Sequence, residues 1–168
     1  VRYMLDLFEN PNIDEMEEPF FWVERSLETH EPYKYCKHHG RDKDEDIPDF
    51  EGNYFDHFTD EEIEENYREA AVKSYEHFKE HVEYLEEQGI LDETLVIFTA
   101  DHGELLGDRI HGRKRYSHNV PACRKLAEVP TLFYNHKIEA ERMRTVDIIP
   151  TALDLLDKQW MMDTDGQS

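Results

Sequence analysis

The 168-residue chain has few cysteines and no long apolar run, and each shortage excludes a class of protein. Its two cysteines, Cys36 and Cys123, allow at most one disulfide, so a small fold held by a disulfide framework is not expected. No apolar run approaches the roughly 18 residues that cross a bilayer as a helix, so no membrane span is predicted. No signal peptide is recognisable either. We therefore expect a cytoplasmic protein.

Lysine and arginine are also scarce: the chain has 19 of them against 40 aspartates and glutamates, which gives a formal net charge of −21. Aromatic residues make up 12% of the chain, which argues against a disordered acidic protein. So negative a chain repels nucleic acids and anionic lipids, and neither is an expected partner. An acidic surface is typical of proteins from salt-loving microbes, because molar salt screens the self-repulsion. We expect a host with a high-salt cytoplasm.

The clearest element in the sequence is an amphipathic helix over residues 60–88. Thr59 and Glu62 have the spacing of a capping box, and Gly89 stands where a C-terminal cap belongs. Between them, apolar residues recur at steps of three and four. The positions on this stripe are Ile63, Tyr67, Ala71, Tyr75, Phe78, Val82 and Leu85.

The residues before the helix predict a strand and a loop. Residues 19–27 begin apolar and aromatic and then admit charge, as a strand leaving a core does. Residues 28–58 contain proline, glycine and runs of acidic residues, which predicts a long acidic surface loop or insertion.

The residues after the helix predict a parallel sheet. Leu95–Phe98 is a continuous apolar run, so we expect Leu95–Thr99 to be a buried central strand with the 60–88 helix packed on one face of its sheet. Residues 130–134 repeat the strand pattern, and Asp147 is expected to cap a helix with Pro150 in its first turn. The sequence thus predicts one α/β domain over residues 1–168, with residues 157–168 as a tail.

The strongest chemical signal is the tetrapeptide Asp101-His102-Gly103-Glu104, directly after the predicted central strand. Sites in open parallel sheets form beyond the carboxyl ends of strands. A carboxylate and an imidazole both ligate divalent cations, and Gly103 permits a tight turn beside them. The alternative is a loop aspartate that caps the next helix beside a solvated histidine.

A basic stretch follows this tetrapeptide. From Arg109 to Ala127 there is no acidic residue, while six cations and two histidines, His111 and His118, fall in this window. Such a loop beside a metal-binding turn suits an oxyanion such as sulfate or phosphate. The alternative is a salt-bridged patch that neutralises the acidic residues of 42–65.

Two other groups of metal-ligating residue types are weaker signals. His77 and His81 have the i, i+4 spacing of a helical metal pair but lack a third ligand, so we interpret them as solvated histidines. Cys36, His38 and His39 have no second pair at the spacing of a zinc finger, and we interpret them as loop residues.

These blocks together resemble the sulfatase family of the alkaline phosphatase superfamily. Residues 94–109 (TLVIFTADHGELLGDR) are similar to the sulfatase segment in which a buried strand delivers a metal-binding pair. Residues 19–33 resemble an upstream strand that ends in a Thr-His-x-Pro-Tyr turn, and residues 144–156 resemble the family's VDxxPTxLDLL helix. The resemblance implies a three-layer, mostly parallel sheet with flanking helices. This chain would form an incomplete version of it.

The resemblance also implies roles for particular residues. Asp101 and His102 would be ligands of a divalent metal, with calcium favoured and manganese or zinc as alternatives. His30 would donate a hydrogen bond to the sulfate, and His111 and Lys114 would contact the anion from the basic loop. His118 is a second candidate for the anion-binding histidine. The expected substrate is a sulfuric ester that is hydrolysed with the help of the metal.

The family's nucleophile motif is not recognisable in the chain. Sulfatases carry a Cys- or Ser-x-Pro/Ala-x-Arg motif whose first residue becomes formylglycine, and neither Cys36 nor Cys123 has these neighbours. The nucleophile and the paired aspartates that complete the metal site are therefore expected in a missing N-terminal half, and this chain alone is expected to be inactive. Two alternatives stay open: a phosphoryl-transfer enzyme of the same superfamily, and a remnant domain that catalyses nothing.

Overall fold

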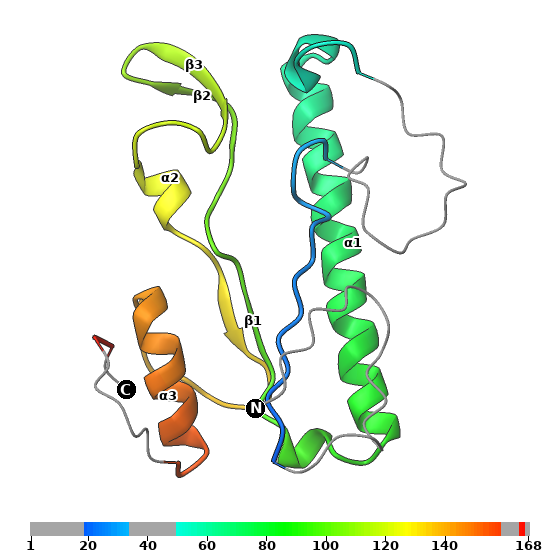
Figure 1. Cartoon of the computed structure of the whole chain (residues 1–168), viewed down its shortest axis with the longest axis vertical. Helices are drawn as coiled ribbons and strands as arrows, with labels where there is room; N and C mark the ends of the chain where they lie inside the picture. The colour runs from blue at the N-terminus through cyan, green and yellow to red at the C-terminus, as the bar shows by residue number, and fades with distance from the viewer. Residues whose placement is uncertain (1–18, 34–49, 159–164, 167–168) are drawn as a thin grey trace. The chain divides into compact units, whose positions relative to one another are not determined.

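The computed structural model describes residues 19–33, 50–158 and 165–166, which fall into two units (Figure 1). The first unit takes in the described residues up to Tyr84 together with Asp101–Val129. The second takes in Leu85–Ala100 and the described residues from Pro130 onward. None of the helices described is long and apolar enough to cross a membrane.

Helix α1 (Asp60–Glu87) forms as predicted, with both caps in place. The Thr59 backbone N–H donates to the Glu62 carboxylate at 2.8 Å, and the Glu62 N–H donates to the Thr59 hydroxyl at 3.3 Å. At the other end, Gly89 adopts a φ of 73°. Its N–H donates to the Glu86 carbonyl and the N–H of Ile90 to the Leu85 carbonyl. The predicted capping box is therefore confirmed, and the helix ends in a Schellman motif.

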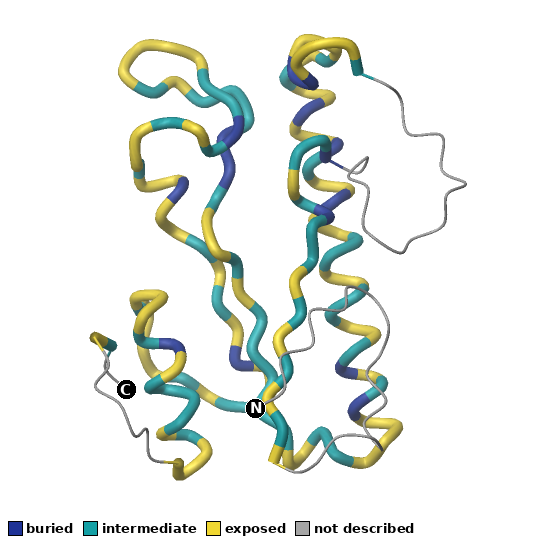
Figure 2. Tube along the Cα trace, in the orientation of Figure 1, coloured by how far each residue is buried: buried dark blue, intermediate teal, exposed yellow. Residues whose placement is uncertain are grey.

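The core of the first unit is aromatic and lies against α1 (Figure 2). Tyr33 is fully buried, and Tyr54 and Phe55 are nearly so. The last two belong to a 3-10 helix, Tyr54–His57, that precedes α1. The prediction of a surface loop over residues 28–58 is thus wrong for these positions, because aromatic side chains spaced among acidic ones still pack together. Residues 34–49, with Cys36, His38 and His39, lie outside the described residues.

Residues 19–33 run alongside α1 in the opposite direction (Figure 1). The Trp22 ring lies 5.2 Å from His81, and the Tyr33 ring lies 5.1 Å from Tyr67. Between these contacts, the hydroxyl of Ser74 donates to that of Ser26. No strand is assigned in this segment, so the strand predicted at residues 19–27 is wrong. The segment meets side chains of a helix rather than the backbone of a neighbouring strand.

The rest of the first unit is a hairpin and a short helix. Strands β2 (Leu105–Ile110) and β3 (Arg113–Ser117) pair antiparallel, with an irregularity between Leu106 and Asp108. Helix α2 (Arg124–Ala127) follows them.

The second unit contains the other sheet, β1 (Ile97–Thr99) paired with β4 (Thr131–Phe133). The pairing is antiparallel, with Phe98 opposite Leu132. The strands predicted near 95–99 and 130–134 therefore exist, but the parallel pairing predicted for Leu95–Thr99 is not found among the described strands. The chain leaves β1 for the hairpin and α2 and returns to β4 in the reverse direction, whereas a parallel pair needs a crossover back to the same end.

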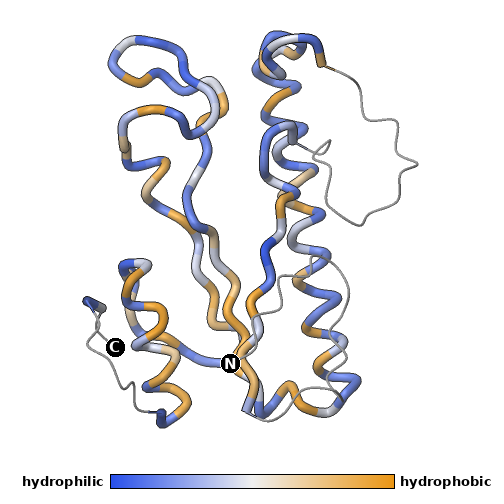
Figure 3. Tube along the Cα trace, in the orientation of Figure 1, coloured by the Kyte–Doolittle hydropathy of each residue, from blue (hydrophilic) through white to orange (hydrophobic). Residues whose placement is uncertain are grey.

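Helix α3 (Ile148–Leu155) is the predicted helix around Pro150. It follows a 3-10 helix, Thr145–Asp147, and its residues are markedly more hydrophobic than those of α1 (Figure 3). The Asp147 carboxylate accepts from the backbone N–H of Arg144 at 2.9 Å, so it caps the 3-10 helix instead of α3. The chain thus combines helices and strands as an α/β fold does, but both sheets described are two-stranded and antiparallel. The predicted mostly parallel sheet, with α1 on one face, is not found among the described residues.

Candidate functional site

The turn that carries Asp101 and His102 is held against α2 in the first unit. The backbone N–H of Gly103 donates to the Leu126 carbonyl at 2.9 Å. A Cβ on Gly103 would lie 2.1 Å from the Lys125 carbonyl oxygen, which no side chain tolerates. The backbone of Gly103 does not have a positive φ, so glycine is required here because of the close approach to Lys125. The turn leaves the side chains of Asp101 and His102 exposed.

Three histidines from separate segments meet beside this turn. His30 comes from the turn after the segment along α1, His102 from the Asp-His-Gly turn, and His118 directly follows β3. The rings of His102 and His118 have centroids 4.3 Å apart, and those of His30 and His118 are 6.3 Å apart. The structure thus brings together three of the residues that the sequence singled out.

Each of the three histidines has its Nδ1 next to an acceptor of the protein. In His30 the partner is the Glu31 carbonyl at 2.7 Å, and in His102 it is the Gly103 carbonyl at 2.9 Å. In His118 the partner is the Glu104 carboxylate at 3.3 Å. Because a carbonyl only accepts, Nδ1 carries the proton in His30 and His102, and Nε2 is left for a metal or for a proton. Such anchoring fixes both the tautomer and the direction of a ring.

Glu104 is the buried acid of the site. Its side chain is only 6% exposed, and burial raises its pKa, although the hydrogen bond to His118 acts in the opposite direction. Burial and the nearby Glu104 charge also raise the pKa of Tyr33 and Tyr67. Glu104 is part of the Asp-His-Gly-Glu motif, but no role was predicted for it. The only signal was its place in the motif, since nothing in the sequence shows that it is buried against His118.

Asp101 places an exposed carboxylate beside His102. Its Oδ1 lies 3.8 Å from the Nε2 of His102, and its Oδ2 lies 3.7 Å from the Arg25 guanidinium. Zinc binds imidazole nitrogen at about 2.0–2.1 Å and carboxylate oxygen at about 2.0–2.2 Å, so a nitrogen and an oxygen on one tetrahedral ion lie about 3.3–3.5 Å apart. The pair therefore comes close to fitting two positions of one coordination shell. Within the described ranges, no group of three or more histidines, cysteines or acids is arranged to hold a metal ion.

The other two predicted anion-binding residues lie on the hairpin. His111 is exposed in the turn between β2 and β3, where its φ is 50°. The Lys114 ammonium lies 2.5 Å from the Asp60 carboxylate at the start of α1, and the hydrogen bond between them raises the pKa of Lys114. Because Asp60 belongs to residues 42–65, the alternative of a salt-bridged basic patch is right for Lys114. No contact joins either residue to the three histidines in the described structure.

The i, i+4 histidines of α1 do not form a metal pair with each other. The His81 ring packs on Trp22, and its Nε2 forms a short contact with the Glu24 carboxylate. His81 is also only partly exposed, so it is a packed histidine and not the solvated one that was predicted.

Known proteins resemble most of this chain. The family model described as Sulfatase matches residues 3–158. The low-salt glycan biosynthesis sulfotransferase Agl7 of Haloferax volcanii is 32% identical over 163 residues, which cover 93% of this chain and 38% of Agl7. The multifunctional alkaline phosphatase superfamily protein PehA of Trinickia caryophylli is 35% identical over 88 residues, or 51% of this chain and 17% of PehA. No solved structure matches. The chain thus spans well under half the length of these two relatives.

Proposed function

This chain belongs to the sulfatase family, and we propose that it supplies part of a metal-dependent active site for sulfuric esters. The observation that carries the proposal is the meeting of His30, His102 and His118 beside Asp101. In all three rings Nδ1 lies next to an acceptor of the protein, so Nε2 is available to bind a ligand or to carry a proton. A set of imidazoles fixed in this way suits an anion whose charge changes during reaction.

In this proposal Asp101 and His102 hold a divalent cation, with calcium favoured and manganese or zinc as alternatives. When bound, the metal acts as a Lewis acid on an ester oxygen. His30 and His118 bind the sulfate, and each can take a proton at Nε2 and deliver it to the oxygen of the leaving alcohol. Glu104 stabilises the protonated form of His118 through Nδ1. His118 rather than His111 or Lys114 is the anion-binding residue that the geometry supports.

Attack on sulfur requires a nucleophile, which we propose comes from residues outside this chain. The chain covers 38% of Agl7, which leaves room for such residues in a longer protein. Asp101 and His102 provide two ligands, whereas calcium takes about six to eight oxygens and zinc about four ligands. The chain alone is therefore expected to bind metal weakly and to hydrolyse neither sulfate nor phosphate esters at a measurable rate.

Transfer of the sulfo group to an acceptor is the second candidate function. Agl7 is named a sulfotransferase, and the same residues would serve transfer if an acceptor hydroxyl replaces water. Phosphoryl transfer is also an alternative, since PehA is named for the wider superfamily.

The test compares aryl sulfate and aryl phosphate turnover by the full-length protein in molar KCl, with and without an added acceptor alcohol. Asp101→Ala and His118→Ala should each lower turnover about 100-fold or more, as removal of one electrostatic group does elsewhere. His111→Ala is the matched control and should change it less than threefold. An equal loss of turnover in all three variants would contradict the assignment of Asp101 and His118 to the site. Turnover that rises with the acceptor favours transfer, and turnover of neither ester favours a remnant domain.

A further inference from the structure

Arg25 brings a guanidinium to the turn that carries Asp101. A terminal nitrogen of Arg25 lies 3.7 Å from the Asp101 Oδ2, and both side chains are well exposed. Among the described residues, Asp101 is the acid with which Arg25 forms an ion pair. An arginine keeps its charge at every pH at which the protein is folded. The turn thus has a permanent cation beside it to which neither the sequence motifs nor the proposed function assigned a role.

The direction of the Arg25 side chain is set by its two neighbours. In an extended chain, successive side chains point to opposite sides. The Glu24 carboxylate contacts the imidazole of His81, and the Ser26 hydroxyl shares a hydrogen bond with Ser74 at 3.3 Å. Both partners belong to α1. Because both neighbours are held against the helix, Arg25 lies on the other side of the segment, where it meets the Asp-His turn.

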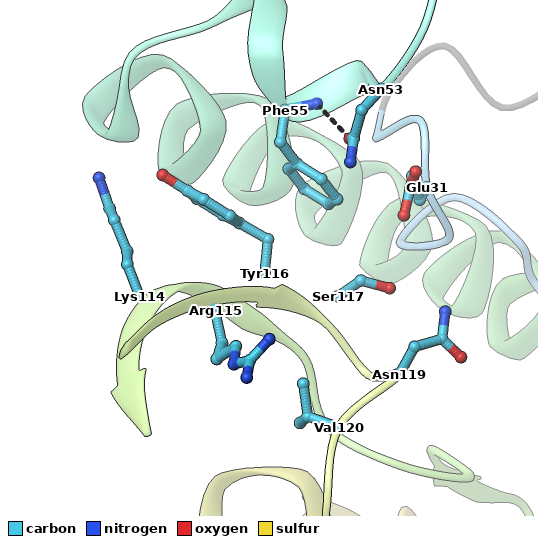
Figure 4. A pocket seen from close by; sticks show the side chains of 9 residues that line it. All are labelled: Glu31, Asn53, Phe55, Lys114, Arg115, Tyr116, Ser117, Asn119 and Val120. Atoms are coloured by element: carbon cyan, nitrogen blue, oxygen red, sulfur yellow. Dashed lines mark hydrogen bonds between the residues drawn. The ribbon is translucent and has the colours of Figure 1, made fainter. Parts of the chain in front are cut away.

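The basic side chains at the end of β3 are placed differently (Figure 4). The Lys114 ammonium is paired with Asp60, and Figure 4 shows its side chain directed away from Ser117, which precedes His118. Arg115 lines the cavity drawn in the same figure, and no ion pair joins it to Asp101 in the described part of the chain. Arg25 is thus the cation that the structure places on the candidate metal ligand.

The ion pair between Arg25 and Asp101 is easily exchanged. Two exposed side chains in water gain little from pairing, so a divalent cation competes well for the same carboxylate. A released guanidinium remains near the turn, because the segment that carries it is anchored to α1 on both sides of Arg25. Its planar set of N–H donors matches the oxygens of a sulfate.

We propose that Arg25 is a further anion-binding residue of this site, which Asp101 holds in the metal-free protein and which becomes available to the sulfate when Asp101 ligates a cation. The inference rests on the proposed function, because it takes Asp101 as a metal ligand and the histidine cluster as the place of the sulfate. Arg25 then makes the two binding events interdependent, and each ligand tightens the binding of the other by the same factor.

The test uses Arg25→Gln in the full-length protein, with Arg68→Gln as the control. Both changes remove one exposed cation that is paired with an acid, but Arg68 lies on α1 and is paired with Glu65. The probes are manganese chloride and potassium sulfate at constant ionic strength. Calorimetric titration gives the Kd of each ion alone and in the presence of a saturating concentration of the other.

We expect Arg25→Gln to act on manganese binding with opposite signs in the two conditions. Without sulfate it should tighten manganese binding about threefold, because a weak competitor for Asp101 is gone. With sulfate it should weaken manganese binding about threefold, because the contact between Arg25 and the anion is lost. Sulfate binding should weaken about tenfold with manganese present and less than about twofold without it, as the same thermodynamic cycle requires. Arg68→Gln should change none of these constants by more than about twofold.

Asp101→Ala gives a second test that needs no metal. It frees Arg25 without a cation, so adding Arg25→Gln to it should weaken metal-free sulfate binding about tenfold. No further loss in that double variant, or equal losses of sulfate binding by Arg25→Gln alone with and without manganese, overturns the inference.

Aryl sulfate turnover by the wild type separates this inference from the proposed function. If the signs reverse but no ester is turned over, the proposed function fails and the exchange of Arg25 stands. If the ester is turned over but the signs do not reverse, the exchange fails and the proposed function stands. If the wild type binds no manganese, the metal ligands of the proposed function fail, and the comparison in the Asp101→Ala background decides whether Asp101 restrains Arg25.

Discussion

Replacing Gly103 by alanine tests whether close packing on α2 positions the Asp-His turn. The new Cβ would lie 2.1 Å from the Lys125 carbonyl oxygen, and contacts under 3.0 Å force a shift. The turn must therefore move by about 0.9 Å, since both contacting groups are backbone. Overpacking of this kind costs about 1–3 kcal/mol. Weakening of the hydrogen bond from Gly103 to Leu126 adds about 1 kcal/mol.

The expected loss in the free energy of unfolding is therefore about 2–4 kcal/mol. It should come with a fall in activity of about 100-fold, because a 1 Å displacement of catalytic groups has an effect of that size. Both are measured on the purified full-length protein in molar KCl, by denaturant unfolding and by ester turnover.

The matched control is Gly112→Ala in the hairpin turn. Gly112 has a φ of 76° and open space around it, so alanine there adds backbone strain of about 1–2 kcal/mol without a clash. It should leave ester turnover unchanged within a factor of three. A Gly103→Ala protein that loses no more stability than Gly112→Ala, or keeps full activity, would refute the packing argument.

Three further predictions concern the stability of the fold. Thr59→Ala removes the hydroxyl of the capping box and should cost about 1 kcal/mol in denaturant unfolding. Thr145→Ala should cost less, because the Thr145 side chain takes no part in the capping box between Arg144 and Asp147. Asp108 is partly buried, yet Lys125 and the Leu106 N–H hold its pKa below the usual 3.8, so its stabilisation is present above that value and is lost as the pH falls. Asp108→Asn should therefore cost about 0.5–1 kcal/mol at neutral pH, and a cost that does not shrink at all as the pH falls below 3.8 would contradict this. The thermal midpoint should rise from dilute buffer to molar KCl, because salt shortens the Debye length from about 30 Å at 0.01 M to about 3 Å at 1 M; a flat midpoint would count against self-repulsion.

Local signals in the sequence predicted the helices well. The capping box at Thr59, the glycine cap at Gly89 and the apolar periodicity between them all depend on neighbours a few residues apart, and α1 has the predicted bounds within one residue. The same holds for α3 around Pro150. A strand pairs with residues far away in the sequence. The apolar run Leu95–Phe98 therefore indicated a strand, but it could not show that β4 runs antiparallel to it.

The aromatic core shows why the surface loop predicted over residues 28–58 was wrong at Tyr54 and Phe55. Tyr54 and Phe55 stand among acidic and polar residues, and their average hydropathy reads as surface. Their burial depends on Ile63 in the helix that follows and on Tyr33, which lies 21 residues before Tyr54 in the sequence. Likewise, the whole basic stretch after Arg109 was predicted to bind an anion. In the structure only His118 joins the histidine cluster, whereas Lys114 forms an ion pair with Asp60.

Asp101 and Glu104 are three residues apart, but the Asp101 side chain is exposed and the Glu104 side chain is buried. Asp101 is 67% exposed and meets Arg25 in an ion pair that is itself exposed, a kind of contact that contributes about 0–1 kcal/mol. A cation can therefore displace Arg25 at little cost, and the Asp101 carboxylate is available as a ligand. Glu104 is buried and contacts both the Nδ1 of His118 and the backbone N–H of Leu105, so moving it would break both contacts. In the proposed function, the exposed acid is thus suited to bind a cation and the buried acid to orient His118.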